Sequence, residues 1–79
     1  MTDARPIALA DGSVVHSDPE ILSGTPVFVG TRVPVETLVE YLEGGYSVSE
    51  FLDNFPSVRR EQVNAFLEQA MQALLARVA

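Results

Sequence analysis

The chain carries, from Ser17 to Val35, the stretch Ser-Asp-Pro-Glu-Ile-Leu-Ser-Gly-Thr-Pro-Val-Phe-Val-Gly-Thr-Arg-Val-Pro-Val. Three prolines and two glycines punctuate its short apolar runs. Because proline fixes φ and removes a backbone donor, and glycine permits a positive φ, this backbone is specified almost residue by residue. No catalytic group dominates the stretch. The stretch therefore predicts a structural segment that serves recognition of a partner, and not a catalytic site.

The stretch leads into the first of three expected helices. Pro34 suits the first helical position, Glu36 lies favourably near the positive end of the helix, and Gly44-Gly45 provides the stop. A capping box of Ser47 and Glu50 starts the second helix, which ends before residue 56, a proline.

The third helix is expected from about Arg60 to Val78, where apolar residues keep the helical period for more than four turns. It is too long for the two short helices to cover. Its C-terminal half is therefore expected to pack on a β ribbon or on another subunit.

A small ribbon is expected before the helices. Residues 7–9 and 14–16 are short apolar runs separated by Asp11-Gly12, a hairpin-turn dipeptide, and residues 27–29 form a further extended run. These runs predict a two- or three-stranded ribbon. We expect residues 1–12 to be a flexible N-terminal segment or the first hairpin strand, and residues 13–79 to be a single domain.

Length and composition limit the class of protein. The 79 residues, 47% of them hydrophobic, suit one small globular domain. A domain of this size buries only about 60% of its unfolded surface, so a homodimer is a plausible way to bury more. Cysteine is absent, which excludes disulfides and thiolate sites. Neither a membrane span nor a secretory signal is recognisable, and the cytoplasm is the expected location.

The charge disfavours nucleic acid as the main partner. The net charge is −6, from 11 acidic residues and five arginines, with no lysine. Proteins that bind nucleic acids usually carry a basic excess. Any DNA contact would need a local arginine cluster, and a basic protein partner fits the overall field better.

The polar residues favour neither catalysis nor a cofactor. Two glycines lie between residues 24 and 32, but Gly-Lys-Ser/Thr does not follow them and Pro26 removes a donor, so nucleotide binding is not expected. His16 is the single histidine and is expected on the solvent side of a strand, with no metal. Asp18 and Glu20 lack an arguable pocket; Asp18-Pro19 is expected to begin a turn.

The arginines are the sharpest candidates. Arg32 lies in the tightly specified turn, where we favour a structural anchor paired with Asp18, Glu36 or free carbonyls over a phosphate or partner contact. At the start of the third helix, a helix-turn-helix arrangement would present four candidate DNA contacts. These are Arg59, Arg60, Gln62 and Asn64, and Arg32 is kept as a further candidate DNA contact. The alternative is an ordinary solvated helix start, and the preceding turn lacks the glycine that is common in helix-turn-helix motifs.

From about Val14 to Ala70 the sequence resembles the small prokaryotic family known as domain of unknown function 433. The matching motifs are Asp18-Pro19-Glu20-Ile21, Gly24-Thr25-Pro26-Val27, Gly30-Thr31-Arg32-Val33-Pro34-Val35, Gly44-Gly45, Ser47 to Glu50, and Phe55-Pro56. We expect Asp18, Pro19, Gly24, Pro26, Gly30, Thr31, Arg32 and Pro34 to act as structural motif residues.

The resemblance implies a mainly α fold, a homeodomain-like or helix-turn-helix-like core of three helices with a short N-terminal β ribbon. It also implies an antitoxin of a type II toxin–antitoxin system, which binds a nuclease-like toxin of the PIN type, usually as a dimer, and commonly represses its own operon. The chain departs from the family pattern at Thr25 and Val29, where basic residues are frequent, and at Arg59, where a Ser/Thr cap is frequent. DNA contact through the ribbon is thereby weakened.

The leading hypothesis is thus a cytoplasmic, homodimeric antitoxin that neutralises a toxin and binds operator DNA through Arg59 and Arg60. A stand-alone DNA-binding regulator and a protein-interaction adaptor are the alternatives. An enzyme is the least expected class, because a nucleophile, a metal-ligand set and a base are all missing from the pattern.

Overall fold

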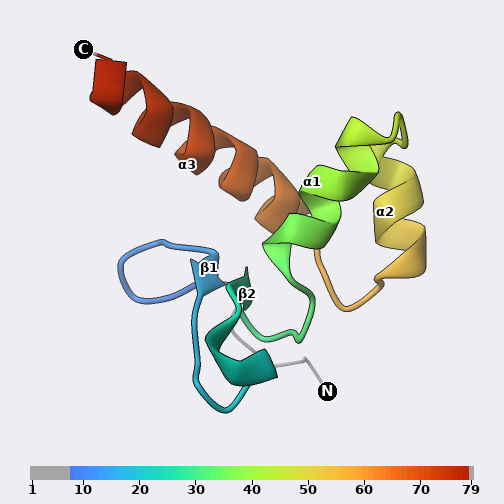
Figure 1. Ribbon diagram of the computed structural model, residues 1–79, viewed down its shortest axis with the longest axis horizontal. Helices are drawn as coiled ribbons and strands as arrows, with labels where there is room; N and C mark the ends of the chain where they lie inside the picture. Colours follow the sequence, from blue (N-terminus) through green and yellow to red (C-terminus); the bar gives the residue numbers. More distant parts are fainter. Residues whose placement is uncertain (1–7, 79) are drawn as a thin grey trace.

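The computed structural model describes residues 8–78 and is mainly helical (Figure 1). A two-stranded antiparallel sheet precedes the three helices in the chain. The elements are β1 (Val15–His16), the 3-10 turn η1 (Leu22–Gly24), β2 (Val27–Phe28), α1 (Val35–Glu43), α2 (Val48–Asn54) and α3 (Arg60–Val78). The expected order of a short ribbon followed by three helices is confirmed.

The sheet of the described residues consists of β1 paired with β2. Val15 lies opposite Phe28 and His16 opposite Val27. The expected hairpin between residues 7–9 and 14–16 is wrong where the structure describes it. Leu9 N instead donates to Ser13 O at 2.8 Å, closing a loop; residue 7 lies outside the described residues.

The entry into α1 is tied to the sheet. Pro34 forms an isolated bridge with Val27, and Val35 N donates to Pro26 O at 3.2 Å. Pro34 is therefore the N-cap, and α1 begins one residue later than expected. This tie fixes the direction in which α1 leaves the ribbon.

Local signals set the other helix ends. Gly44 is the C-cap of α1, and Gly45 follows with φ of +87°. At the start of α2, Glu50 N donates to Ser47 Oγ at 3.1 Å and Ser47 N donates to Glu50 Oε2 at 3.4 Å, which is the expected capping box.

Aromatic rings fill the core between β2, α1 and α2. Phe51 lies 6.3 Å from Phe28 and 5.5 Å from Tyr41, measured between ring centroids. Phe28 also meets Phe66 of α3, edge to face at 5.9 Å. The buried core comprises Phe28, Val33, Leu38, Phe51, Val58 and Val63.

The third helix begins in the core and then leaves it. Gln62 and Val63 are its buried residues among those described, and its C-terminal half projects from the body in Figure 1. The radius of gyration is 13.0 Å, against about 11.6 Å for a compact domain of this length. One contact reaches back: Gln69 Nε2 donates to Gly12 O at 2.9 Å.

None of the helices within residues 8–78 combines the length and the apolar character needed to cross a membrane.

Candidate functional site

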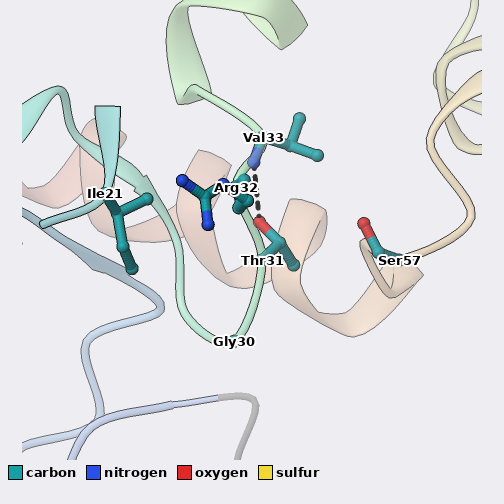
Figure 2. Close-up of a pocket in the computed structure, with 6 residues that line it drawn as sticks. All are labelled: Ile21, Gly30, Thr31, Arg32, Val33 and Ser57. Carbon is teal, nitrogen blue, oxygen red and sulfur yellow. Dashed lines mark hydrogen bonds between the residues drawn. The ribbon is translucent and has the colours of Figure 1, made fainter.

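A tight reversal between β2 and α1 organises the candidate site. Phe28 N donates to Val33 O at 3.1 Å, so the four residues between them form the turn. Thr31 is buried inside it, and its Oγ1 donates to Phe28 O at 2.9 Å. The same oxygen accepts from Val33 N at 3.0 Å (Figure 2). Gly30 has φ of +79°, which a side chain rarely adopts. Gly30 and Thr31 thus build the turn, as expected for motif residues.

Arg32 projects from this turn into solvent. It lines an open hollow of about 580 Å³ together with Ile21, Gly30, Thr31, Val33 and Ser57. In Figure 2 its guanidinium lies on the side of the turn that faces Ile21. No ion pair or side-chain hydrogen bond of Arg32 is present within residues 8–78. The anchoring role favoured from the sequence, with Asp18 or Glu36 as partner, therefore has no contact to support it.

The side chain of Gln62 is buried and connects the start of α3 to the reversal; we call this connection the Gln62 latch. It is 1% exposed. Its Nε2 donates to Val29 O at 2.8 Å, and its Oε1 accepts from Arg59 N at 3.0 Å. The prediction that Gln62 contacts DNA is corrected accordingly, because the side chain has no surface to offer and joins the start of α3 to the reversal. One signal was available: Gln62 lies four residues before Phe66, on the inward side of the helix.

The other predicted DNA contacts are exposed. Arg59, Arg60 and Asn64 all face solvent at the start of α3. Arg60 Nη2 donates to Ser49 Oγ on α2 at 3.0 Å. Because Gln62 holds this helix start against Val29, and the hollow joins Arg32 to Ser57, the arginines at 32, 59 and 60 flank one junction.

The segment before β2 contains the remaining motif residues. Asp18 Oδ1 accepts from Glu20 N at 2.9 Å and Asp18 O accepts from Ile21 N at 2.8 Å, with Pro19 inside that turn as expected. Gly24 follows Leu22 and Ser23, and all three have a positive φ. The positive φ of Leu22 was not predictable from the residue type, because a bulky side chain rarely adopts it.

His16 was expected on the solvent side of a strand, and its position in the structure differs from that prediction. It is half-buried, and its Nε2 is buried without a hydrogen-bond partner among the described residues. Within the same residues, no group of three or more His, Cys, Asp or Glu side chains is arranged to hold a metal ion.

A family model described as "Protein of unknown function (DUF433)" matches residues 15–70. The chain belongs to the DUF433 family. It is also similar to the "Uncharacterized protein y4eO" of Sinorhizobium fredii, with 44% identity over 50 residues. That match spans 63% of this chain but 23% of the relative, so the chain covers under a quarter of that protein. A comparison with solved structures found no match.

Charge is unevenly distributed over this DUF433 chain. Residues 33–58, which contain α1 and α2, carry five carboxylates and no arginine, lysine or histidine. The five are exposed, and three of them share one face of α1 at a spacing of four and three residues. We call this set the acidic face: Glu36, Glu40, Glu43, Glu50 and Asp53. In Figure 1 it belongs to the two helices opposite the free end of α3.

Proposed function

We propose that this chain is the antitoxin of a type II toxin–antitoxin pair, and that it neutralises a nuclease-like toxin of the PIN type. The acidic face is the observation that carries the proposal. It holds five of the chain's 11 carboxylates, with no cation between residues 33 and 58 to neutralise them.

A nuclease needs a cationic surface, because it must hold the phosphate backbone of its substrate. A rigid acidic face on two helices is complementary to such a surface and would occlude it. Opposite potentials also accelerate encounter, which suits an inhibitor that must act quickly. Because Gly44 ends α1, a capping box starts α2, and both helices pack on the aromatic core, the face is preorganised for binding.

Co-expression of the chain with the product of its neighbouring gene is expected to give a stable stoichiometric complex on size exclusion. The triple variant Glu36→Gln, Glu40→Gln, Glu43→Gln is expected to slow association and to raise Kd roughly tenfold at low salt. The difference should shrink at high salt, because exposed charges are screened. Association rates at two ionic strengths measure both effects.

A variant that removes three charges outside the face, Glu20→Gln with Glu61→Gln and Glu68→Gln, is the matched control, since all three residues are exposed. It is expected to change the association rate much less than the α1 triple variant does. An equal decrease in the association rate of both variants would assign the effect to net charge and not to the acidic face. Separate elution of the two proteins would refute toxin binding for that pair.

Operator binding is the second candidate, as part of the antitoxin or in a stand-alone regulator. We propose a helix-turn-helix-like, homeodomain-like core in which α2 and α3 are the paired helices and α3 is the recognition helix. The exposure of Arg59, Arg60 and Asn64 at the start of α3 favours this assignment, and so does the position of Arg32 beside it.

Replacing both Arg59 and Arg60 with alanine is expected to weaken binding to the promoter DNA of its own operon. The slope of log K against log salt should fall in magnitude by about 2, one for each lost phosphate contact. Arg77→Ala, near the other end of α3, is the control and should leave the slope unchanged. An unchanged slope in the double variant would end the DNA assignment.

A further inference from the structure

Within residues 8–78, the distal part of α3 carries an apolar stripe that no other element covers. Its large side chains remain 41% (Leu67), 49% (Met71), 61% (Leu74), 55% (Leu75) and 73% (Val78) exposed. Single exposed apolar residues are ordinary, but a contiguous patch marks an interaction site. The stripe includes neither residues of the acidic face nor the arginines at 32, 59 and 60.

The spacing of the stripe is that of a helix pair. Leu67, Met71, Leu74 and Val78 follow one another at intervals of four, three and four residues, which is the seam of a two-stranded coiled coil. Ala70 and Leu75 flank the seam and widen it. The stripe is therefore shaped to receive another helix along its length.

The charge around the stripe favours a second copy of this chain as the source of the helix that packs on it. Residues 62–78 contain one acidic residue, Glu68, and one basic residue, Arg77, so this segment is neutral in a chain of net charge −6. Two copies can meet here without confronting like charges, which they could not do through the acidic face. A basic partner would find no charge complement on this helix.

The apolar stripe is also complementary to a second copy of itself about a twofold axis. We propose that two copies of this chain associate through α3 as an antiparallel helix pair, with the axis between Gln72 and Ala73. Met71 then lies opposite Leu74 of the partner subunit, and Leu67 opposite Val78 of the partner subunit. Such an isologous contact closes at two subunits.

The antiparallel direction follows from where the acidic residues lie. The body that contains the acidic face is attached at the N-terminal end of α3, and the helix projects away from it (Figure 1). A parallel pair would place the two acidic bodies side by side. An antiparallel pair places them at opposite ends and so separates the like charges beyond the range of an exposed interaction in salt.

The available area sets the expected affinity. Five half-exposed side chains, at roughly 100 Å² each when fully exposed, give about 500 Å² of apolar area for the two copies together. Alanines and backbone increase this figure, but it stays below the roughly 1,200 Å² of standard specific interfaces and therefore fits a weak, reversible association. A dissociation constant in the micromolar range is therefore expected, and the dimer should form and dissociate within ordinary working concentrations.

Sedimentation equilibrium of the 79-residue chain alone, between about 1 and 200 µM, tests the proposal. The mass is expected to rise from that of one copy to that of two. Leu74→Glu, in the stripe, should raise the dimer Kd at least tenfold, because a carboxylate would be buried. Ala76→Glu, on the opposite side of the same helix, adds the same charge and should leave Kd within about twofold. Circular dichroism confirms that both variants keep their helices.

A monomer at every concentration would overturn the proposal, and so would a dimer that Leu74→Glu does not weaken. Cysteine crosslinking tests the direction, since the chain has no cysteine of its own. Oxidation of a mixture of Met71→Cys and Leu74→Cys chains should give the mixed disulfide faster than either alone. Faster self-crosslinking of each variant would show a parallel pair and refute the antiparallel register. None of these readouts involves a toxin or DNA, so their failure is distinct from failure of the proposed function.

Discussion

Phe51→Ala is expected to lower the free energy of unfolding by about 3–5 kcal/mol, the usual cost of removing a buried aromatic ring. Phe51 is 0% exposed and its ring centroid lies 5.0 Å from that of Phe55 and 5.5 Å from that of Tyr41. A chain of this length is stable by only about 4–12 kcal/mol. The substitution therefore removes a large part of the total, and urea unfolding followed by circular dichroism measures it.

Phe51→Leu is the matched control for this loss. Leucine keeps most of the apolar volume, so the expected cost is below about 1.5 kcal/mol. The exposed Leu74 gives a second comparison, because Leu74→Ala below the dimer concentration removes no core contact. A Phe51→Ala protein within 1 kcal/mol of the unsubstituted chain would contradict the aromatic core described here.

The helices were predictable because their boundaries depend on neighbouring residues. The Ser47 and Glu50 pair needs only the first turn of α2, and Gly44-Gly45 needs only the last turn of α1. The sheet was harder, since strand pairing joins residues distant in the chain. Asp11-Gly12 suggested a local hairpin, whereas the burial of Val27 and Phe28 ties β2 to β1 across η1.

The candidate site was predicted in part, for a similar reason. The pattern Gly30-Thr31 pointed correctly to a specified turn, because both residues act on their own backbone. Arg32 and Gln62 differ from the favoured expectations in opposite directions: Arg32, favoured as an anchor over a phosphate contact, is exposed, and Gln62, expected as a surface donor, is buried. Whether a polar side chain is buried depends on the partner opposite it, and the partner of Gln62 is Val29, 33 residues away.

Gln62→Glu is expected to cost about 3–5 kcal/mol of unfolding free energy at pH 7, the scale for placing an uncompensated charge in a buried position. The amide donates to Val29 O at 2.8 Å, and a carboxylate there would set oxygen against oxygen. The contact from Arg59 N at 3.0 Å would survive, because it needs only an acceptor. Loss of the latch should also loosen the start of α3 against the reversal that carries Arg32.

The pH dependence of this variant separates buried charge from a change of shape. Burial raises the pKa of the new carboxyl above its unfolded value of about 4.3, so the folded state binds the proton more tightly. The penalty is therefore full above the raised pKa, declines as the pH falls through it, and is absent below about 4.3. Protonated, the group can again donate to Val29 O.

Unfolding of the variant and of the unsubstituted chain should be compared at the same pH, since the other carboxylates affect both equally. Gln69→Glu is the control: Gln69 makes the same kind of bond, to Gly12 O at 2.9 Å, but is exposed. Water solvates the carboxylate of the Gln69→Glu variant, so this variant should lose little stability and should not regain stability as the pH falls. A Gln62→Glu deficit that stays constant from pH 7 to pH 4 would mean that the side chain is not buried against Val29, and the latch would have to be abandoned.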